Sequence, residues 1–137
     1  MKRFTNQEFN EFMRERTKQF ALQMIELSDR LPNKESARVI NRQLLRSATS
    51  VAANFRAACR GRSKAEFYSK VCIVVEEADE TQFWLDLLVD SKLVDNQIPD
   101  VKKLINEASE ILAVTTSIKN KLKQYSNGKT SEIPKDE

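Results

Sequence analysis

Apolar residues recur along this chain in steps of three and four, in four separate stretches. The first stripe comprises Met13, Thr17, Phe20, Met24, Leu27 and Leu31. Similar stripes run from Ala37 to Ala58, from Phe67 to Leu88 and from Val101 to Tyr125. Such spacing places each set on one side of an α-helix. The pattern predicts helices at about 6–31, 34–60, 64–91 and 99–126.

The residues between the stripes carry signals for helix ends. Thr5-Asn6-Gln7-Glu8 and Ser63-Lys64-Ala65-Glu66 both have the form of a capping box, which satisfies backbone donors at a helix start. Pro32 ends the first helix, because residues before proline avoid the helical region. Asn33 is a candidate cap for the second helix, and Pro99 suits the first turn of the fourth.

Four helices of similar length with three short connections predict an all-α fold. The expected architecture is an up-down-up-down antiparallel four-helix bundle with helix crossing angles of about 20°. We expect residues 1–126 to form this single domain. The polar remainder, 127–137, is expected to be a flexible tail.

Composition narrows the class of protein further. The chain has 137 residues, of which 40% are apolar and 31% charged, typical of one globular domain. Two glycines and three prolines are too few for turn-rich β folds or phosphate-binding loops. No apolar run is long enough to span a membrane, and the first residues lack the apolar stretch of a signal peptide. We therefore expect a cytoplasmic protein.

Several chemistries are disfavoured by what the sequence lacks. It contains no histidine, no Walker loop and no GxGxxG turn, so no nucleophile–base pair or nucleotide fingerprint can be assembled. Cys59 and Cys72 form no CxxC pair and fit small buried hydrophobes better than a zinc site. The acidic run 76–80 flanks an apolar stripe and fits an ion-paired surface better than a metal site. We expect neither an enzyme nor a cofactor.

The third predicted helix is apolar on two sides. At 100° per residue, Phe83 and Leu87 lie opposite the main stripe, with Trp84 close by. A helix that is apolar on both faces is normally buried on both. The second face therefore predicts a protein–protein contact. The alternative is an irregular bundle that buries Trp84 at the flank of its own helix.

The second predicted helix has a basic outer face, which includes Arg42, Arg46, Ala53, Arg56 and Arg60. Through Arg62 the chain has 13 basic and 6 acidic residues, whereas the rest has 10 and 14. One subunit thus presents two surfaces of opposite sign. Such surfaces favour a heterologous contact, which closes into a ring when the rotation allows.

We infer a subunit interface in which helix two of one copy packs on helix three of the next. The predicted interface residues are Arg42, Arg46, Ala53, Glu76, Glu80, Phe83, Trp84 and Leu87. In this hypothesis Arg42 and Arg46 meet the glutamates of the neighbour while the apolar side chains supply contact area. A bridge within one subunit remains an open alternative, because the hairpin puts Arg46 level with Glu77.

The segment from Ile40 to Val94 resembles the bacterial four-helix bundle proteins named after intervening sequences in 23S rRNA genes. Matching positions are Gln43-Leu44-Leu45-Arg46-Ser47-Ala48, Ser50, Ala53, Asn54, Arg62-Ser63-Lys64, Glu66-Phe67 and Glu80. The chain departs from the family pattern at Ala57 and Ala58, where members often carry glutamate and glycine. Any role tied to that glutamate does not carry over.

The resemblance implies a homopentameric ring of up-down bundles without established enzymatic activity. The accessory variability determinants of diversity-generating retroelements are distantly similar. That group consists of basic pentamers that work with a reverse transcriptase and bind nucleic acid. The charges of the outer faces favour a ring but do not fix the number of its subunits.

Two hypotheses for function follow. The first is a non-enzymatic oligomeric scaffold that binds nucleic acid through a basic end comprising Arg56, Arg60, Arg62 and Lys64. Repetition around a ring would multiply weak phosphate contacts. The alternative is a protein-interaction module that binds a polymerase or another protein without touching nucleic acid. Solvated helix ends that serve solubility are the plainest explanation of the same charges.

Overall fold

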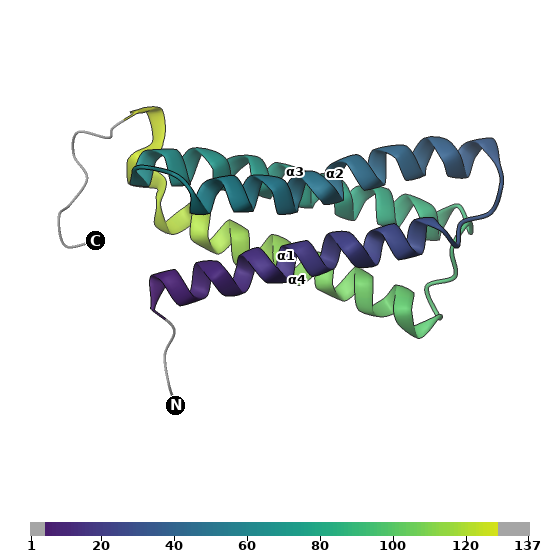
Figure 1. Ribbon diagram of the computed structural model, residues 1–137. Helices are drawn as coiled ribbons and strands as arrows, with labels where there is room; N and C mark the ends of the chain where they lie inside the picture. Colours follow the sequence, from purple (N-terminus) through teal and green to yellow (C-terminus); the bar gives the residue numbers. More distant parts are fainter. Residues whose placement is uncertain (1–4, 129–137) are drawn as a thin grey trace.

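The computed structural model describes residues 5–128, which form four α-helices, one short 3-10 helix and no β-strand. The elements are α1 (Asn6–Ser28), α2 (Glu35–Cys59), α3 (Lys64–Asp90), α4 (Pro99–Lys121) and η1 (Lys123–Gly128). Figure 1 shows the helices side by side, with the α1–α2 and α3–α4 connections at one end and the α2–α3 turn at the other. The all-α prediction is confirmed. Among the residues described, no helix has the length and apolarity needed to cross a membrane.

The predicted stripes form the core between these helices. Most of their members are buried, including the polar residues Thr17, Thr81 and Thr115, which are completely inaccessible. Thr17 and Thr115 donate their hydroxyl hydrogens to carbonyls of their own helices, as in the 2.7 Å bond from Thr115 Oγ1 to Ile111 O. The hydroxyl of Thr81 lies within hydrogen-bond distance of both Glu77 O, at 2.7 Å, and Ser47 Oγ, at 2.9 Å. Burial is therefore compatible with the hydroxyl.

The first helix is shorter than predicted. It ends at Ser28 instead of residue 31. Beyond it, the N–H groups of Arg30 and Leu31 bond carbonyls three residues back, at 2.9 and 3.3 Å, instead of four. The chain tightens before Pro32, which disfavours helical geometry in the preceding residue.

The predicted cap at Asn33 is wrong. Lys34 occupies the N-cap of α2 and makes no side-chain cap. Asn33 Oδ1 instead accepts a 2.6 Å hydrogen bond from Arg38 Nη1. The carboxamide oxygen is thus used by a nearby guanidinium, and not by the backbone donors of the helix.

The fourth helix also ends earlier than predicted, at Lys121 instead of residue 126. The chain turns at Leu122 and continues as η1, which contacts α3. This turn lets Tyr125 become buried, at 2% exposure, although it no longer belongs to α4. Asn127 and Gly128, predicted to start a flexible tail, belong to η1; the rest of that predicted tail, 129–137, and residues 1–4 lie outside the described part of the chain.

A hydrogen-bonded turn leads from α3 toward α4. Lys92 adopts a positive φ of 65°, and its N–H bonds Val89 O while Leu93 N–H bonds Leu88 O, both at 3.0 Å. These two bonds form a Schellman motif. The residue with positive φ in this motif, here Lys92, is usually glycine. The loop then reaches Pro99, which opens α4 as predicted.

Candidate subunit interface and basic end

The outer side of α3 carries an apolar surface that residues 5–128 leave partly uncovered. Phe83 is 53% exposed, whereas Leu85, two residues along, is 2% exposed. Leu87 is half-buried. The rings of Phe83 and Trp84 meet edge to face, with centroids 4.9 Å apart. The second apolar face predicted for this helix is therefore present, and Phe83 is its most exposed residue.

Trp84 lies at the flank of the helix and is partly covered. It packs against the main core, and its indole Nε1–H donates a 2.9 Å hydrogen bond to Glu80 Oε2. This bond fixes the ring against the α3 surface. Trp84 thus follows the alternative of flank burial, while Phe83 remains free to contact another molecule.

An ion-pair cluster joins α2 to α3 beside this surface. Arg46 Nη1 donates to Glu77 at 3.2 Å, and Arg46 Nη2 donates to Glu80. Ser50 Oγ donates to Glu77 Oε2 at 3.0 Å. The pKa of Arg46 is raised, chiefly by its hydrogen bond with Glu80. The hydrogen bond from Trp84, followed by that from Arg46, lowers the pKa of Glu80.

The cluster gives Arg46 and Glu80 partners within one chain. The bridge within a subunit, which the sequence left open, is therefore what the structure contains, and a cross-subunit partner is not needed for either residue. Arg42 and Glu76 are exposed and make no ion pair with any residue between 5 and 128. Ala53 is also exposed on α2. Their place in a subunit contact stays a prediction, as does that of Phe83 and Leu87.

The four predicted nucleic-acid-binding residues fall into two groups. Arg56 is exposed on α2, and Arg60 at the C-cap of that helix and Arg62 in the turn that follows are exposed too, whereas Lys64 is half-buried at the start of α3. The three arginine side chains make no ion pair with the described residues. Arg62 and Lys64 line a pocket, but Arg56 and Arg60 do not.

The α2–α3 turn is held by its own side chains. Ser63 Oγ accepts a 3.1 Å hydrogen bond from Glu66 N, as the predicted capping box requires. Glu66 Oε1, however, accepts its 2.7 Å bond from Arg62 N and not from the Ser63 backbone. Gly61 allows the close approach here, since a Cβ would lie 3.1 Å from Ala58 O and 3.2 Å from Phe67 N.

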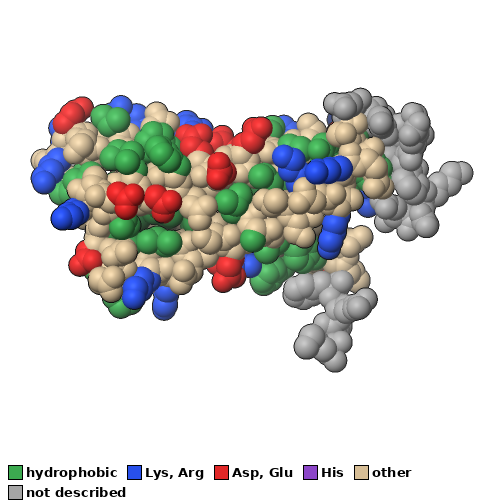
Figure 2. Space-filling view, turned by 180° about the vertical axis from the view of Figure 1, so that it is seen from behind, with side chains coloured by type: hydrophobic (Ala, Val, Ile, Leu, Met, Phe, Trp, Pro, Cys, Tyr) green, Lys and Arg blue, Asp and Glu red, His purple; other side chains and the backbone are tan. Residues whose placement is uncertain are grey.

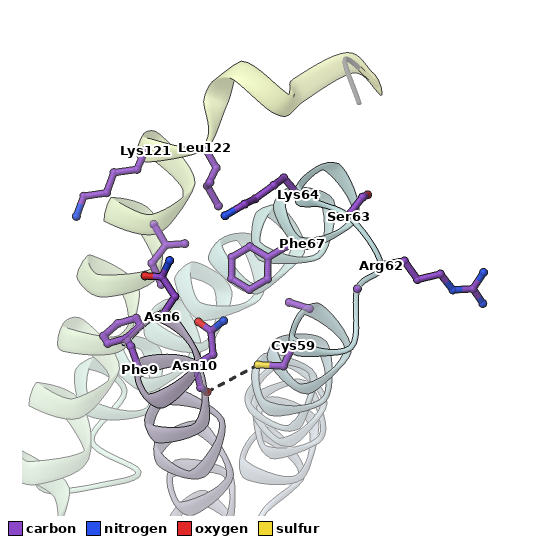
Figure 3. Close-up of a pocket in the computed structure, with 13 residues that line it drawn as sticks. Asn6, Phe9, Asn10, Cys59, Arg62, Ser63, Lys64, Phe67, Lys121 and Leu122 are labelled. Carbon is purple, nitrogen blue, oxygen red and sulfur yellow. Dashed lines mark hydrogen bonds between the residues drawn. The ribbon is translucent and has the colours of Figure 1, made fainter. Parts of the chain in front are cut away.

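The pocket at this end of the molecule has a volume of about 660 Å³. It lies between the start of α1, the α2–α3 turn and the end of α4, as Figure 3 shows. Cys59 Sγ donates a 3.7 Å hydrogen bond to the Asn10 carbonyl across it, and burial raises the pKa of this thiol. No local sequence pattern indicates this pocket, because its residues come from segments far apart along the chain.

A second hollow, of about 590 Å³, lies between α1 and α4. Arg16 bridges the two helices there. Its Nε and Nη2 donate to both carboxylate oxygens of Glu107, and Nη2 also donates to Glu110, all at 2.7 Å. The hydrogen bond to Glu107 is the main cause of the raised pKa of Arg16. Sequence reasoning missed this bridge, since 91 residues separate its first pair.

The described surface shows no metal-binding constellation. No group of three or more cysteines, aspartates or glutamates between residues 5 and 128 is arranged to hold a metal ion. On the face shown in Figure 2, apolar side chains reach the surface in separate patches between basic and acidic ones.

The fold and these surfaces define a small all-helical protein with an exposed apolar side on α3 and exposed arginines at one end. The chain belongs to the 23S rRNA-intervening sequence protein family, whose model matches residues 3–117. It is similar to the crystal structure of a protein of unknown function from the S23 ribosomal protein family of Bacteroides thetaiotaomicron. The two share 31% identity over 81% of this chain and 97% of that chain, with a TM-score of 0.73. No curated protein matches the chain.

Proposed function

We propose that this chain is the up-down-up-down subunit of a homopentameric, non-enzymatic ring that binds nucleic acid in the cytoplasm. The observation that carries the nucleic-acid part is the row of exposed arginines, Arg56, Arg60 and Arg62, without ion-pair partners in the described chain. Five copies of this row would bind phosphates together by avidity.

The ring is supported by the uncovered apolar side of α3. Phe83 is the most exposed of the large apolar side chains in the described chain, and the half-buried Leu87 lies one helical turn further along α3. Arg42 on α2 and Glu76 on α3 are exposed charges of opposite sign. A contact between α2 of one subunit and α3 of the next would bring these charges together and cover Phe83.

Light scattering tests the ring. The double variant Phe83→Glu with Leu87→Glu is expected to be a helical monomer, with about one-fifth of the native mass, because two charges would be buried at each contact. The matched control is Leu22→Glu with Ile25→Glu, which also charges two exposed apolar side chains but lies on α1. A native mass for the α3 variant would overturn the ring through this face.

A salt series tests nucleic-acid binding. Affinity for duplex RNA is expected to fall by about 10³-fold or more between 50 and 200 mM salt, as contacts to six or more phosphates require. Arg56→Glu with Arg60→Glu should abolish this binding. Lys102→Glu with Lys103→Glu makes the same charge change at the opposite end of the molecule and should retain it. Salt-independent binding would exclude phosphate contacts as its source.

The alternative is a module that binds a polymerase or another protein without nucleic-acid contact. The exposed apolar residues outside the proposed ring contact, such as Leu22 and Ile25 on α1, favour it. In that case Arg60→Glu with Arg62→Glu would leave pulldown of the protein partner unchanged. The native protein would also fail to bind RNA at low salt.

A further inference from the structure

We propose that the pocket at the α2–α3 turn holds an unpaired nucleotide, with its base inside and its phosphate at the mouth. This deepens the proposed function, on which it rests, because the occupant would belong to the bound strand. The pocket volume of about 660 Å³ falls in the range of about 300–1,000 Å³ typical of small-molecule sites. A nucleoside monophosphate group is of suitable size.

The inside of the pocket suits a flat aromatic ring. Its apolar lining includes Phe9, Phe67, Ile118 and Leu122. In Figure 3 the Phe67 ring stands in the middle of the lining residues. Phe55 packs edge to face against Phe67 at a centroid distance of 6.4 Å, which holds that ring in place. Bases stack on such rings irrespective of their sequence.

Two carboxamides add hydrogen-bonding capacity to this lining. Asn6 and Asn10 line the pocket from α1, and neither side-chain amide has a hydrogen-bond partner within residues 5–128. Each amide offers both a donor and an acceptor, the pair that matches the edge of a base. A simple fatty-acid site would have little use for two such groups.

The mouth is cationic. Lys64 and Lys121 border it from α3 and α4, and Arg62 extends outward from the turn, as Figure 3 shows. None of the 13 lining residues is acidic. The nearby Glu66 is engaged by the Arg62 backbone N–H. Arg62 also connects this mouth to Arg60 on the basic end, so a strand bound there would have phosphates near the pocket.

The test uses Cys59, which lines the pocket, as a reporter. In the full chain with Cys72→Ser, Cys59 is the single thiol, and serine preserves a hydroxyl partner for Tyr68. Saturating AMP is expected to slow alkylation of Cys59 by about fivefold or more. Adenosine and ribose 5-phosphate should bind about tenfold more weakly than AMP, because each lacks one half of the recognised group. Equal protection by decanoate or by inorganic phosphate would overturn the assignment.

A pair of lysines supplies the matched control. Lys121→Glu is expected to weaken AMP binding by about tenfold or more, whereas Lys123→Glu should change it by less than about twofold. Both lysines are exposed at the same end, but only Lys121 lines the pocket. Equal effects of the two substitutions would mean that only the general field of this end attracts AMP, and the pocket assignment would fail.

RNA binding separates this inference from the proposed function. A duplex with a single-stranded overhang should bind more tightly than a blunt duplex, and Asn6→Ala should remove that difference without affecting the blunt duplex. RNA binding without any AMP protection of Cys59 would overturn the pocket assignment and leave the proposed function standing. AMP protection without any RNA binding would overturn the proposed function and, with it, the strand nucleotide as occupant.

Discussion

The α1–α4 and α2–α3 pairs are both bridged by one arginine that reaches two glutamates, but the bridges have different surroundings. The Arg16 side chain is 21% exposed and the Arg46 side chain 46%. Their partners Glu107 and Glu77 are 26% and 17% exposed, so the two bridges differ in the arginine and not in the glutamate. Beneath the Arg46 bridge lies a closed contact, in which the buried hydroxyls of Ser47 and Thr81 meet at 2.9 Å. Beside the Arg16 bridge there is a hollow of about 590 Å³.

This difference shows that an arginine bridge between helices can span an open contact, as at Arg16, or lie over a closed one, as at Arg46. The backbones of α1 and α4 approach each other at few positions, so the Arg16 bridge spans a more open contact than that between α2 and α3. The α2–α3 pair would remain packed without Arg46, whose bridge lies on the outside of an already closed contact. We therefore expect unequal costs for removing the two arginines.

Arg16→Met should have the largest effect on the free energy of unfolding, a loss of about 1–3 kcal/mol. Methionine keeps the apolar stem but leaves the partly buried Glu107 carboxylate without its donors. Urea unfolding at one fixed protein concentration measures the loss. The control Arg14→Met changes an exposed arginine of the same helix and should stay within about 0.5 kcal/mol of the native value. Equal losses in the two variants would contradict the importance of the bridge.

Two buried threonines, Thr81 and Thr115, allow a polar contact between helices to be compared with one inside a helix. Thr81→Val should cost about 1 kcal/mol, because Ser47 Oγ on α2 loses a donor. Thr115 is equally buried but bonds only carbonyls of its own helix, Ile111 and Leu112. Thr115→Val should therefore cost less than Thr81→Val. Thermal unfolding of both variants checks the order, and the reverse order would show that no polar contact across α2 and α3 contributes.

The buried side of each helix could be predicted from the sequence, because its residues recur with the period of an α-helix. Even Thr17, Thr81 and Thr115 occupy the buried positions that the stripes assign to them. The end of α4 could not be predicted in this way. Tyr125 keeps the helical spacing and is buried, but it reaches its place through the turn at Leu122.

The candidate sites were only partly predictable, since side-chain partners across helices have no local signature. The exposed Phe83 followed from its angle on α3. Arg46 could have bonded a glutamate of its own chain or of a neighbouring subunit. Which of the two it bonds depends on how α2 and α3 are placed side by side, and a periodic pattern does not contain that information. The pocket depended on three chain segments meeting, and nothing in any one of them indicates the others.

The smallest expected effect is that of Arg46→Met, because partly exposed ion pairs contribute about 0–1 kcal/mol. The sign of its pH dependence is fixed by Glu80, whose pKa lies below the ordinary value of 4.5. The stabilisation is fully present above that ordinary pKa and is lost as the pH falls through the lowered one. The stability difference between native protein and variant should therefore shrink below about pH 4.

Trp84 provides a direct measurement of the same pair, since it is the single tryptophan of the chain and its Nε1–H bonds the Glu80 carboxylate. Protonation of Glu80 weakens that bond and changes the indole emission. The acid midpoint of the emission should rise in Arg46→Met, because one group that favours the carboxylate is gone. The Arg42→Met control, which removes an exposed arginine of the same helix with no ion pair in the described chain, should leave the midpoint unchanged. An unchanged midpoint in Arg46→Met would mean that Arg46 does not contribute to the lowered pKa of Glu80.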